Sequence, residues 1–125
     1  MTPQDRIIDF RYLVTQPDLN AHGTLHGGIL IKWADESAGM HARKVTKGVC
    51  VTRCVDRINF VQTARAGAVI KITSRLAAAG KTSLTFSSTI KNDITGEMIA
   101  TIDRLIFVFV DGNHNPIPHQ VKIDV

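Results

Sequence analysis

One helical pattern, which begins at a pair of glycines and is followed only by strand patterns, limits what this chain can fold into. Across residues 26–44, apolar or small side chains cover most of a helix drawn at about 100° per residue. Such a helix is normally buried. Residues 49–61, 68–78, 82–91 and 98–110 are rich in Val, Ile, Thr and Phe, which predicts strands, and residues 9–14 predict a shorter one. We therefore expect an α+β fold with a long central helix, wrapped by a strongly curved antiparallel sheet of about five strands.

The last predicted strand is apolar on both faces over residues 105–109, which indicates a central place in the sheet. The tail, residues 111–125, contains two prolines and is predicted to be irregular. At 125 residues, without repeats or linkers, we expect one domain over residues 1–125. A single sheet of this size leaves edges and a face uncovered, so we expect pairing with a second copy of the chain.

The helix carries one carboxylate where apolar residues are expected. Its polar stripe consists of Lys32, Glu36 and Arg43, within about 40° of one another on the helical projection. Asp35 projects roughly 60° from that stripe. A carboxylate among small and apolar neighbours can serve as an acid or a base. Asp35 could equally lie at the margin of the exposed stripe, near Lys32, and the pattern supports both interpretations. One broad side of the helix is predicted to carry Ile29, Leu30, Trp33, Ser37, Met40 and Lys44, and its small or apolar surface is extended by Ile31, Ala34, Ala38 and Ala42.

Gly27 and Gly28 stand where the helix is expected to begin. The first N–H groups of a helix have no intrahelical partner, and glycine lets another group approach them closely. The positive end of the helix dipole lies there too, so this end could hold a developing oxyanion. Two glycines could also serve only to form a tight turn.

Composition excludes several function classes. The net charge of +4 and a pI of about 9.4 suit an anionic ligand but are too mild for nucleic acid, and no basic run is present. The longest apolar run, residues 105–110, is too short to cross a membrane, and residues 1–11 do not resemble a signal peptide. We expect a cytoplasmic protein. Cys50 and Cys54 would lie about 13 Å apart on one strand, beyond disulfide reach, so reduced thiols are expected.

Other segments partly match known functional motifs but lack residues that those motifs require. Gly80-Lys81-Thr82 resembles the end of a P-loop, but the first glycine of that motif is missing and strands follow. This turn could still hold a phosphate by charge and hydroxyl groups, or be a plain hairpin loop. His22 and His26 have a spacing found in metal sites, but no further ligands cluster nearby, and no metal is expected. Neither a Gly-x-Ser-x-Gly sequence nor a basic partner for a cysteine nucleophile is evident.

The pattern Asn20-x-x-Gly23-x-x-x-Gly27-Gly28, followed by Trp-Ala-Asp at 33–35, resembles the hotdog-fold acyl-CoA thioesterases, in particular their YciA-like and cytosolic acyl-CoA hydrolase branch. The resemblance continues through Arg-Ile-Asn-Phe-Val at 57–61, Gly-Lys-Thr-Ser at 80–83 and Phe-Val-Phe-Val-Asp at 107–111, nearly the whole chain. It implies a hotdog fold and hydrolysis of acyl-CoA to a free carboxylic acid and coenzyme A, without a separate cofactor.

The resemblance also implies roles for particular residues. Asp35 would act as a general base on water or attack the carbonyl directly, and the partner subunit's Asn20 would orient the water or the thioester. The N–H of Gly27 or Gly28 would polarise the thioester oxygen. The phosphates or pantetheine of coenzyme A would bind Arg57, Lys81, Thr82 and Ser83. The family implies a homodimer with shared active sites, assembled further into a hexamer or tetramer.

Three alternatives stay open at this point. Glu36 follows Asp35 directly, and other hotdog thioesterases use a glutamate on this helix, but its place on the exposed stripe favours Asp35. A hotdog enoyl-CoA hydratase or dehydratase would act through Asp111 or His119, although the run at 111–119 follows the last strand and does not open a helix. A non-catalytic acyl-CoA-binding protein is the third possibility, and regulators of that kind usually carry a DNA-binding segment.

Overall fold

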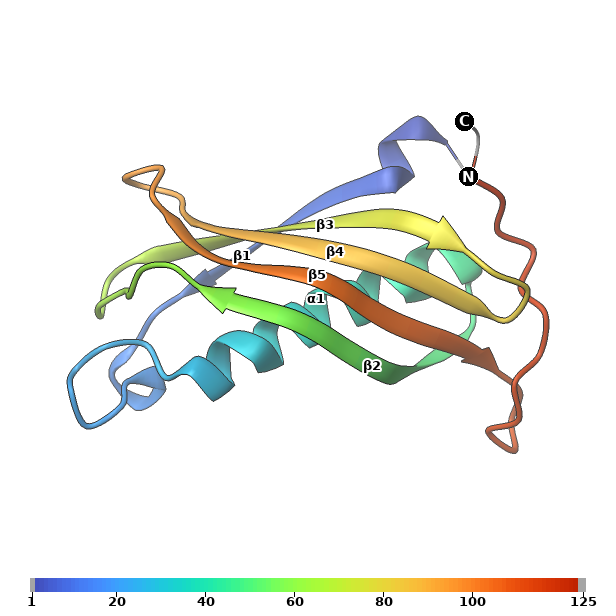
Figure 1. Ribbon diagram of the computed structural model, residues 1–125, viewed down its shortest axis with the longest axis horizontal. Coiled ribbons are helices and arrows are strands. Elements are labelled where there is room, and N and C mark those ends of the chain that lie inside the picture. The colour runs from blue at the N-terminus through green and yellow to red at the C-terminus, as the bar shows by residue number, and fades with distance from the viewer. Residues whose placement is uncertain (1, 124–125) are drawn as a thin grey trace.

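A computed structural model describes residues 2–123 of the chain. One long helix lies along a five-stranded antiparallel sheet whose strand order is β1-β3-β4-β5-β2 (Figure 1). In chain order the elements are the 3-10 helix η1 (Pro3–Arg6), β1 (Ile7–Leu13), the 3-10 helix η2 (Gln16–Asp18), α1 (Gly27–Thr46), β2 (Val49–Phe60), β3 (Val69–Ala79), β4 (Ser83–Asn92) and β5 (Met98–Val110). The α+β prediction is confirmed, and each predicted element begins and ends within two residues of the observed one.

The core lies between α1 and one face of the sheet. Strands β3 and β4 alternate buried and less buried side chains along most of their length, as a half-covered sheet requires. Phe86 on β4 contacts Phe107 on β5 edge to face, with ring centroids 5.8 Å apart. The predicted central place of β5 is confirmed, because it pairs with both β4 and β2. Small residues of α1 allow the helix to lie close to the sheet, and those buried completely are Ala34, Ala38 and Ala42.

The helix is not covered on all sides within one chain, so that part of the prediction is wrong for the isolated subunit. Met40, predicted on the apolar side, leaves 49% of its surface exposed. Lys44 was placed on the same side but is also exposed, and its ammonium lies 3.7 Å from the carboxylate of Asp5. Trp33 is buried and stacks on Tyr12, with ring centroids 4.8 Å apart. The open side of α1 therefore carries both polar and apolar residues.

Strand β2 forms one edge of the sheet, and it is irregular. It pairs with β5, and its register shifts between Thr52 and Cys54, as in a β-bulge. Further along, Arg57 adopts a left-handed backbone conformation (φ 58°), which is unusual for a non-glycine residue inside a strand. These two departures from regular geometry bend β2 around α1 and change which side chains face the helix. Within residues 2–123, the other edge of β2 has no strand partner.

Over residues 111–123 the tail after β5 is irregular, as predicted, and it is docked against the sheet; residues 124 and 125 lie outside the described part of the chain. Asp111 accepts hydrogen bonds from the backbone N–H groups of Asn113 and Asn115 and closes a turn. Pro116 then forms an isolated bridge with Val110. The tail continues beside the turn between β3 and β4 (Figure 1), where His119 makes contact with it.

Candidate functional site

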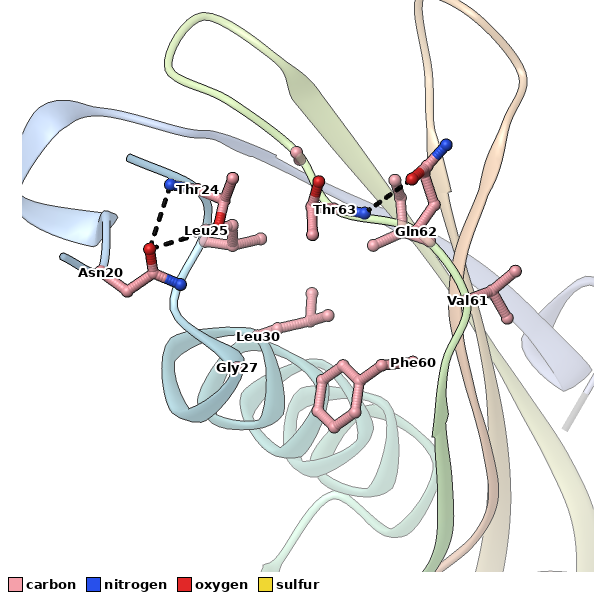
Figure 2. Close-up of a pocket in the computed structure, with 11 residues that line it drawn as sticks. Asn20, Thr24, Leu25, Gly27, Leu30, Phe60, Val61, Gln62 and Thr63 are labelled. Carbon is pink, nitrogen blue, oxygen red and sulfur yellow. Dashed lines mark hydrogen bonds between the residues drawn. The ribbon is translucent and has the colours of Figure 1, made fainter. Parts of the chain in front are cut away.

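Asn20 occupies a tightly organised loop between η2 and α1. Its Oδ1 accepts hydrogen bonds from the N–H of His22 at 2.9 Å, from the N–H of Thr24 at 3.1 Å and from the hydroxyl of Thr24 at 3.2 Å. Because Oδ1 is committed to the loop, the side-chain amide nitrogen is the end that remains for a ligand. Figure 2 shows this nitrogen pointing toward the end of the helix that carries Gly27.

The N–H groups of Gly27 and Gly28 have different surroundings at the start of α1. His26 is the N-cap, and its ring Nδ1 accepts a hydrogen bond from the N–H of Gly28 at 2.9 Å. The N–H of Gly28 is therefore already used. Gly27 is the first residue of the helix, where an N–H has no intrahelical acceptor, and it lines a hollow together with Asn20 (Figure 2). Of the two donors considered from the sequence, Gly27 is the one placed to meet a ligand.

The hollow beside Gly27 has a volume of about 340 Å³. It lies between the start of α1 and the segment that follows β2. The ring of Phe60 lies beside Gly27, and a Cβ on that glycine would be in ordinary van der Waals contact with it, at 3.4 Å. Polar groups of Asn20, Thr24, Gln62 and Thr63 surround a mostly apolar lining, whose members are Leu25, Leu30, Phe60, Val61, Ala64 and Ile99. Such a cavity suits an apolar group attached to a polar one.

Asp35 lies elsewhere on the helix. It is half-buried, and its Oδ1 accepts a hydrogen bond of 2.7 Å from the hydroxyl of Thr52 on the edge strand β2. Thr52 was not among the candidates from the sequence, because a Thr in a strand pattern carries no sign of which helix residue it will face. Glu36 is exposed, in agreement with its predicted place on the polar stripe.

A single chain does not bring Asn20 and Asp35 together. Asp35 is eight residues beyond Gly27, or about 12 Å further along the helix axis. It does not line the hollow that contains Asn20 and Gly27. The chain therefore holds two partial sites, one at the start of α1 and one where the middle of α1 meets β2.

The residues predicted to hold coenzyme A are also dispersed. Arg57 is exposed on β2, and Lys81, Thr82 and Ser83 form the turn between β3 and β4. That turn lies at the opposite end of the sheet from the start of α1 (Figure 1), where the hollow is found. Within one chain, these residues and the Asn20–Gly27 hollow do not form one continuous site.

The cysteines were expected to be reduced thiols, and the histidines were not expected to bind a metal. Cys50 and Cys54 are free thiols, as expected, and burial raises the pKa of Cys50. Within residues 2–123, no cluster of three or more His, Cys, Asp or Glu side chains is arranged to hold a metal ion. In the same part of the chain, no helix has both the length and the apolar character needed to cross a membrane.

Comparison with known proteins shows which family this chain belongs to. The model of the thioesterase superfamily matches residues 22–99, which is more than half of the chain. The chain belongs to the thioesterase superfamily. One long helix against a five-stranded antiparallel sheet matches the hotdog fold of thioesterases in this superfamily, which confirms the resemblance drawn from the sequence.

Two relatives illustrate the range of this thioesterase superfamily. The human cytosolic acyl coenzyme A thioester hydrolase is 40% identical over 73 residues, which are 58% of this chain and 19% of the human protein. The chain therefore spans about a fifth of the length of that relative. The acyl-CoA thioester hydrolase YciA of Salmonella typhimurium is 27% identical over 127 residues, covering 97% of this chain and 95% of YciA.

Two solved structures are similar over most of the chain. An apo-hexameric acyl-CoA thioesterase is 28% identical with a TM-score of 0.83, and the match covers 93% of this chain and 76% of that one. The acyl-CoA hydrolase of Staphylococcus aureus, solved with butyryl coenzyme A and coenzyme A, is 25% identical with a TM-score of 0.81. That match covers 93% of this chain and 70% of the other.

Proposed function

We propose that this protein hydrolyses acyl-CoA thioesters to a carboxylic acid and coenzyme A, in active sites formed between two copies of the chain. The observation that carries the proposal is the separation of two complementary partial sites. Asn20 and Gly27 offer N–H donors beside an apolar hollow, whereas Asp35 offers a carboxylate beside β2, whose outer edge has no strand partner within residues 2–123. Antiparallel pairing of two β2 edges would run the two helices in opposite directions and place Asp35 near the partner subunit's Asn20.

In this arrangement each group has one task. The side-chain amide of Asn20 and the N–H of Gly27 would donate to the thioester oxygen and stabilise the charge that develops on it. Asp35 would either remove a proton from a water molecule or attack the carbonyl carbon itself. In the first route the activated water adds to the carbonyl carbon, the C–S bond breaks, and the coenzyme A thiolate takes up the proton that Asp35 removed. In the second route Asp35 displaces the coenzyme A thiolate and forms a mixed anhydride, and a water molecule then cleaves the anhydride to the carboxylic acid and the free Asp35 carboxylate, with the thiolate gaining a proton from water. The hydrogen bond from Thr52 would hold the carboxylate in one orientation.

The substrate would extend in two directions from the reacting carbonyl. The acyl chain fits the apolar part of the hollow beside Phe60. The phosphates of coenzyme A fit the basic character of the chain, and we assign them to Lys81, Thr82 and Ser83, with Arg57 as a further contact. A hexameric assembly is the expectation drawn from the hexameric structural neighbour. The cytosolic human relative agrees with a place in the cytoplasm.

Variants of the Staphylococcus aureus hydrolase add support to the residue assignments. Alanine replacements of an Asn, an Asp and a Thr have been solved in that enzyme. Those three residues follow one another at the same intervals as Asn20, Asp35 and Thr52 do here. Residue type, order and spacing thus agree with the roles proposed for all three.

The two tail residues that a hydratase would use, His119 and Asp111, are engaged in hydrogen bonds. Both ring nitrogens of His119 are engaged, one with the carbonyl of Ser83 and the other with the N–H of Val121. One oxygen of the Asp111 carboxylate, Oδ1, accepts two hydrogen bonds within its turn. His119 therefore has no free ring nitrogen to act as an acid or base, which favours the thioesterase.

Two inactive variants, tested alone and together, provide the decisive experiment. Asp35→Asn removes the base or nucleophile. Asn20→Asp keeps the oxygen that organises the loop but removes the amide donor. Each variant alone should release almost no thiol from an acyl-CoA. Subunits mixed by co-expression should regain about a quarter of the wild-type rate, because half the dimers are mixed and each has one intact site.

Mixing would restore nothing if each site were built from a single chain. Near wild-type turnover by Asp35→Asn would refute the role of that residue. The controls are circular dichroism and size-exclusion chromatography, in which both variants should match the wild type.

A further inference from the structure

His119 is a buried histidine that the proposed chemistry does not use. It leaves 8% of its surface exposed, although both of its chain neighbours are exposed. Its Nδ1 accepts a hydrogen bond from the N–H of Val121 at 3.1 Å, so the ring hydrogen is on Nε2, which donates to the carbonyl of Ser83 at 2.8 Å. Its backbone N–H donates to the carbonyl of Lys81 at 3.2 Å. One tail residue therefore binds the turn between β3 and β4 at two points.

These contacts give the turn a defined polarity. The carbonyl of Thr82 accepts from the N–H of Phe109 at 2.8 Å, so all three carbonyls from Lys81 to Ser83 are taken up by the tail or by β5. The backbone N–H groups of Lys81 and Thr82, by contrast, donate to no acceptor within residues 2–123. The groups left for a ligand are these two N–H donors, the exposed Lys81 ammonium and the Thr82 hydroxyl. Adjacent N–H groups beside a cation form a setting that binds anions.

We propose that His119 is a positioning residue, which holds the turn between β3 and β4 in the conformation that binds the phosphate groups of coenzyme A. This inference rests on the proposed function. Without the imidazole, the Ser83 carbonyl would keep only the N–H of Gly80 as a donor, at 2.9 Å, and the tail would hold the turn by the single hydrogen bond from the His119 backbone N–H to Lys81. The N–H groups of Lys81 and Thr82 would then be held less firmly in the orientation that meets a phosphate. The tail passing beside the turn (Figure 1) thus acts on the nucleotide end of the substrate, away from the thioester.

The test compares two substrates that differ only in the nucleotide: an acyl-CoA and the same acyl group on pantetheine. In His119→Ala, KM for acyl-CoA should rise about tenfold, which is the loss of about one organising hydrogen bond. The kcat for acyl-CoA should be unchanged, and so should both constants for acyl-pantetheine. His119→Gln, whose amide can donate to the Ser83 carbonyl, should restore most of the affinity. The matched control is Gln120→Ala, at a neighbouring exposed residue with no hydrogen bond to the turn within residues 2–123, and it should behave as wild type.

Lys81→Ala tests the contribution of the turn separately from that of the tail. It should raise KM for acyl-CoA and not for acyl-pantetheine, and combining it with His119→Ala should add little. Equal losses on both substrates in His119→Ala would mean a merely structural role and would overturn the proposal, as would unchanged constants on both. If the wild type released thiol from neither substrate, the proposed hydrolysis would be wrong. Calorimetric binding of 3′,5′-ADP would then still decide the matter, with about tenfold weaker binding by His119→Ala as the expected result.

Discussion

His41 should make the stability of this protein depend on pH, and the structure gives the direction and the size. The imidazole is fully buried on α1. Its Nε2 donates to the carbonyl of Asp5 at 2.5 Å, and its Nδ1 accepts from the hydroxyl of Ser74 at 2.9 Å. Burial lowers the pKa of His41, and the nearby Lys44 ammonium lowers it further, while the Asp5 carbonyl and carboxylate act in the opposite direction. The folded protein therefore holds this ring neutral.

Proton linkage gives the direction in which the free energy of unfolding changes with pH. Because the pKa of His41 is lower in the folded state, the unfolded chain binds the proton more tightly, and the free energy of unfolding falls as the pH falls below about 6.5. An unfolded-state histidine is about 90% protonated at pH 5.5. The loss between pH 7.5 and pH 5.5 is then up to about 1.4 kcal/mol. It stops growing once the pH is below the folded-state pKa of His41.

His41→Gln isolates this contribution. The amide of Gln can still donate to the Asp5 carbonyl but does not titrate. Urea unfolding of both proteins at pH 7.5 and pH 5.5, at one fixed protein concentration, gives the difference, because the other four histidines titrate in both. We expect the wild type to lose about 1 kcal/mol more than the variant on acidification. Equal losses in the two proteins would refute the argument that His41 is held neutral.

Two further substitutions test single contacts. Thr52→Val removes the hydroxyl that donates to Asp35 while keeping the side-chain shape. It should lower kcat about tenfold in thiol-release assays, with Thr52→Ser near wild type. Ser88→Ala should raise the free energy of unfolding by about 1 kcal/mol in urea titrations, because its buried hydroxyl has no hydrogen-bond partner within residues 2–123. Ser74→Ala is the matched control, and it should destabilise the protein by about the same amount, since the Nδ1 of His41 then loses its donor.

Local sequence patterns were enough to predict the elements of this fold. A 3.6-residue period across α1 and Val- and Ile-rich runs in the strands are local properties, so each is visible in a short window of sequence. The same projection separated Asp35 from Glu36, and the exposure of Glu36 confirms that distinction. The family resemblance singled out Asn20 and Gly27, and both line the hollow at the start of α1.

The contacts that complete the site depend on geometry that no short window contains. Thr52 meets Asp35 from a strand whose register shifts directly after it, and such a bulge has no consistent sequence signature. His41 was overlooked because a histidine counts as polar on a helical projection, although two hydrogen bonds satisfy it in the core. The role of His26 as the N-cap of α1 was missed because His is not among the residues that usually occupy that position.

The one feature of α1 that was predicted wrongly for a single chain is also informative about assembly. The apolar pattern surrounds most of the helix, yet the chain covers only one side of it and leaves Met40 half exposed. Met40 and Cys50 line one shallow hollow between α1 and β2, and Val49 at the start of β2 is also exposed. Asp35 also faces β2, where it accepts the hydrogen bond from Thr52. An apolar pattern around most of the helix is explained if a second copy of the chain pairs along β2 and covers the side that one chain leaves open. The same contact would bury Met40 and remove water from around Asp35.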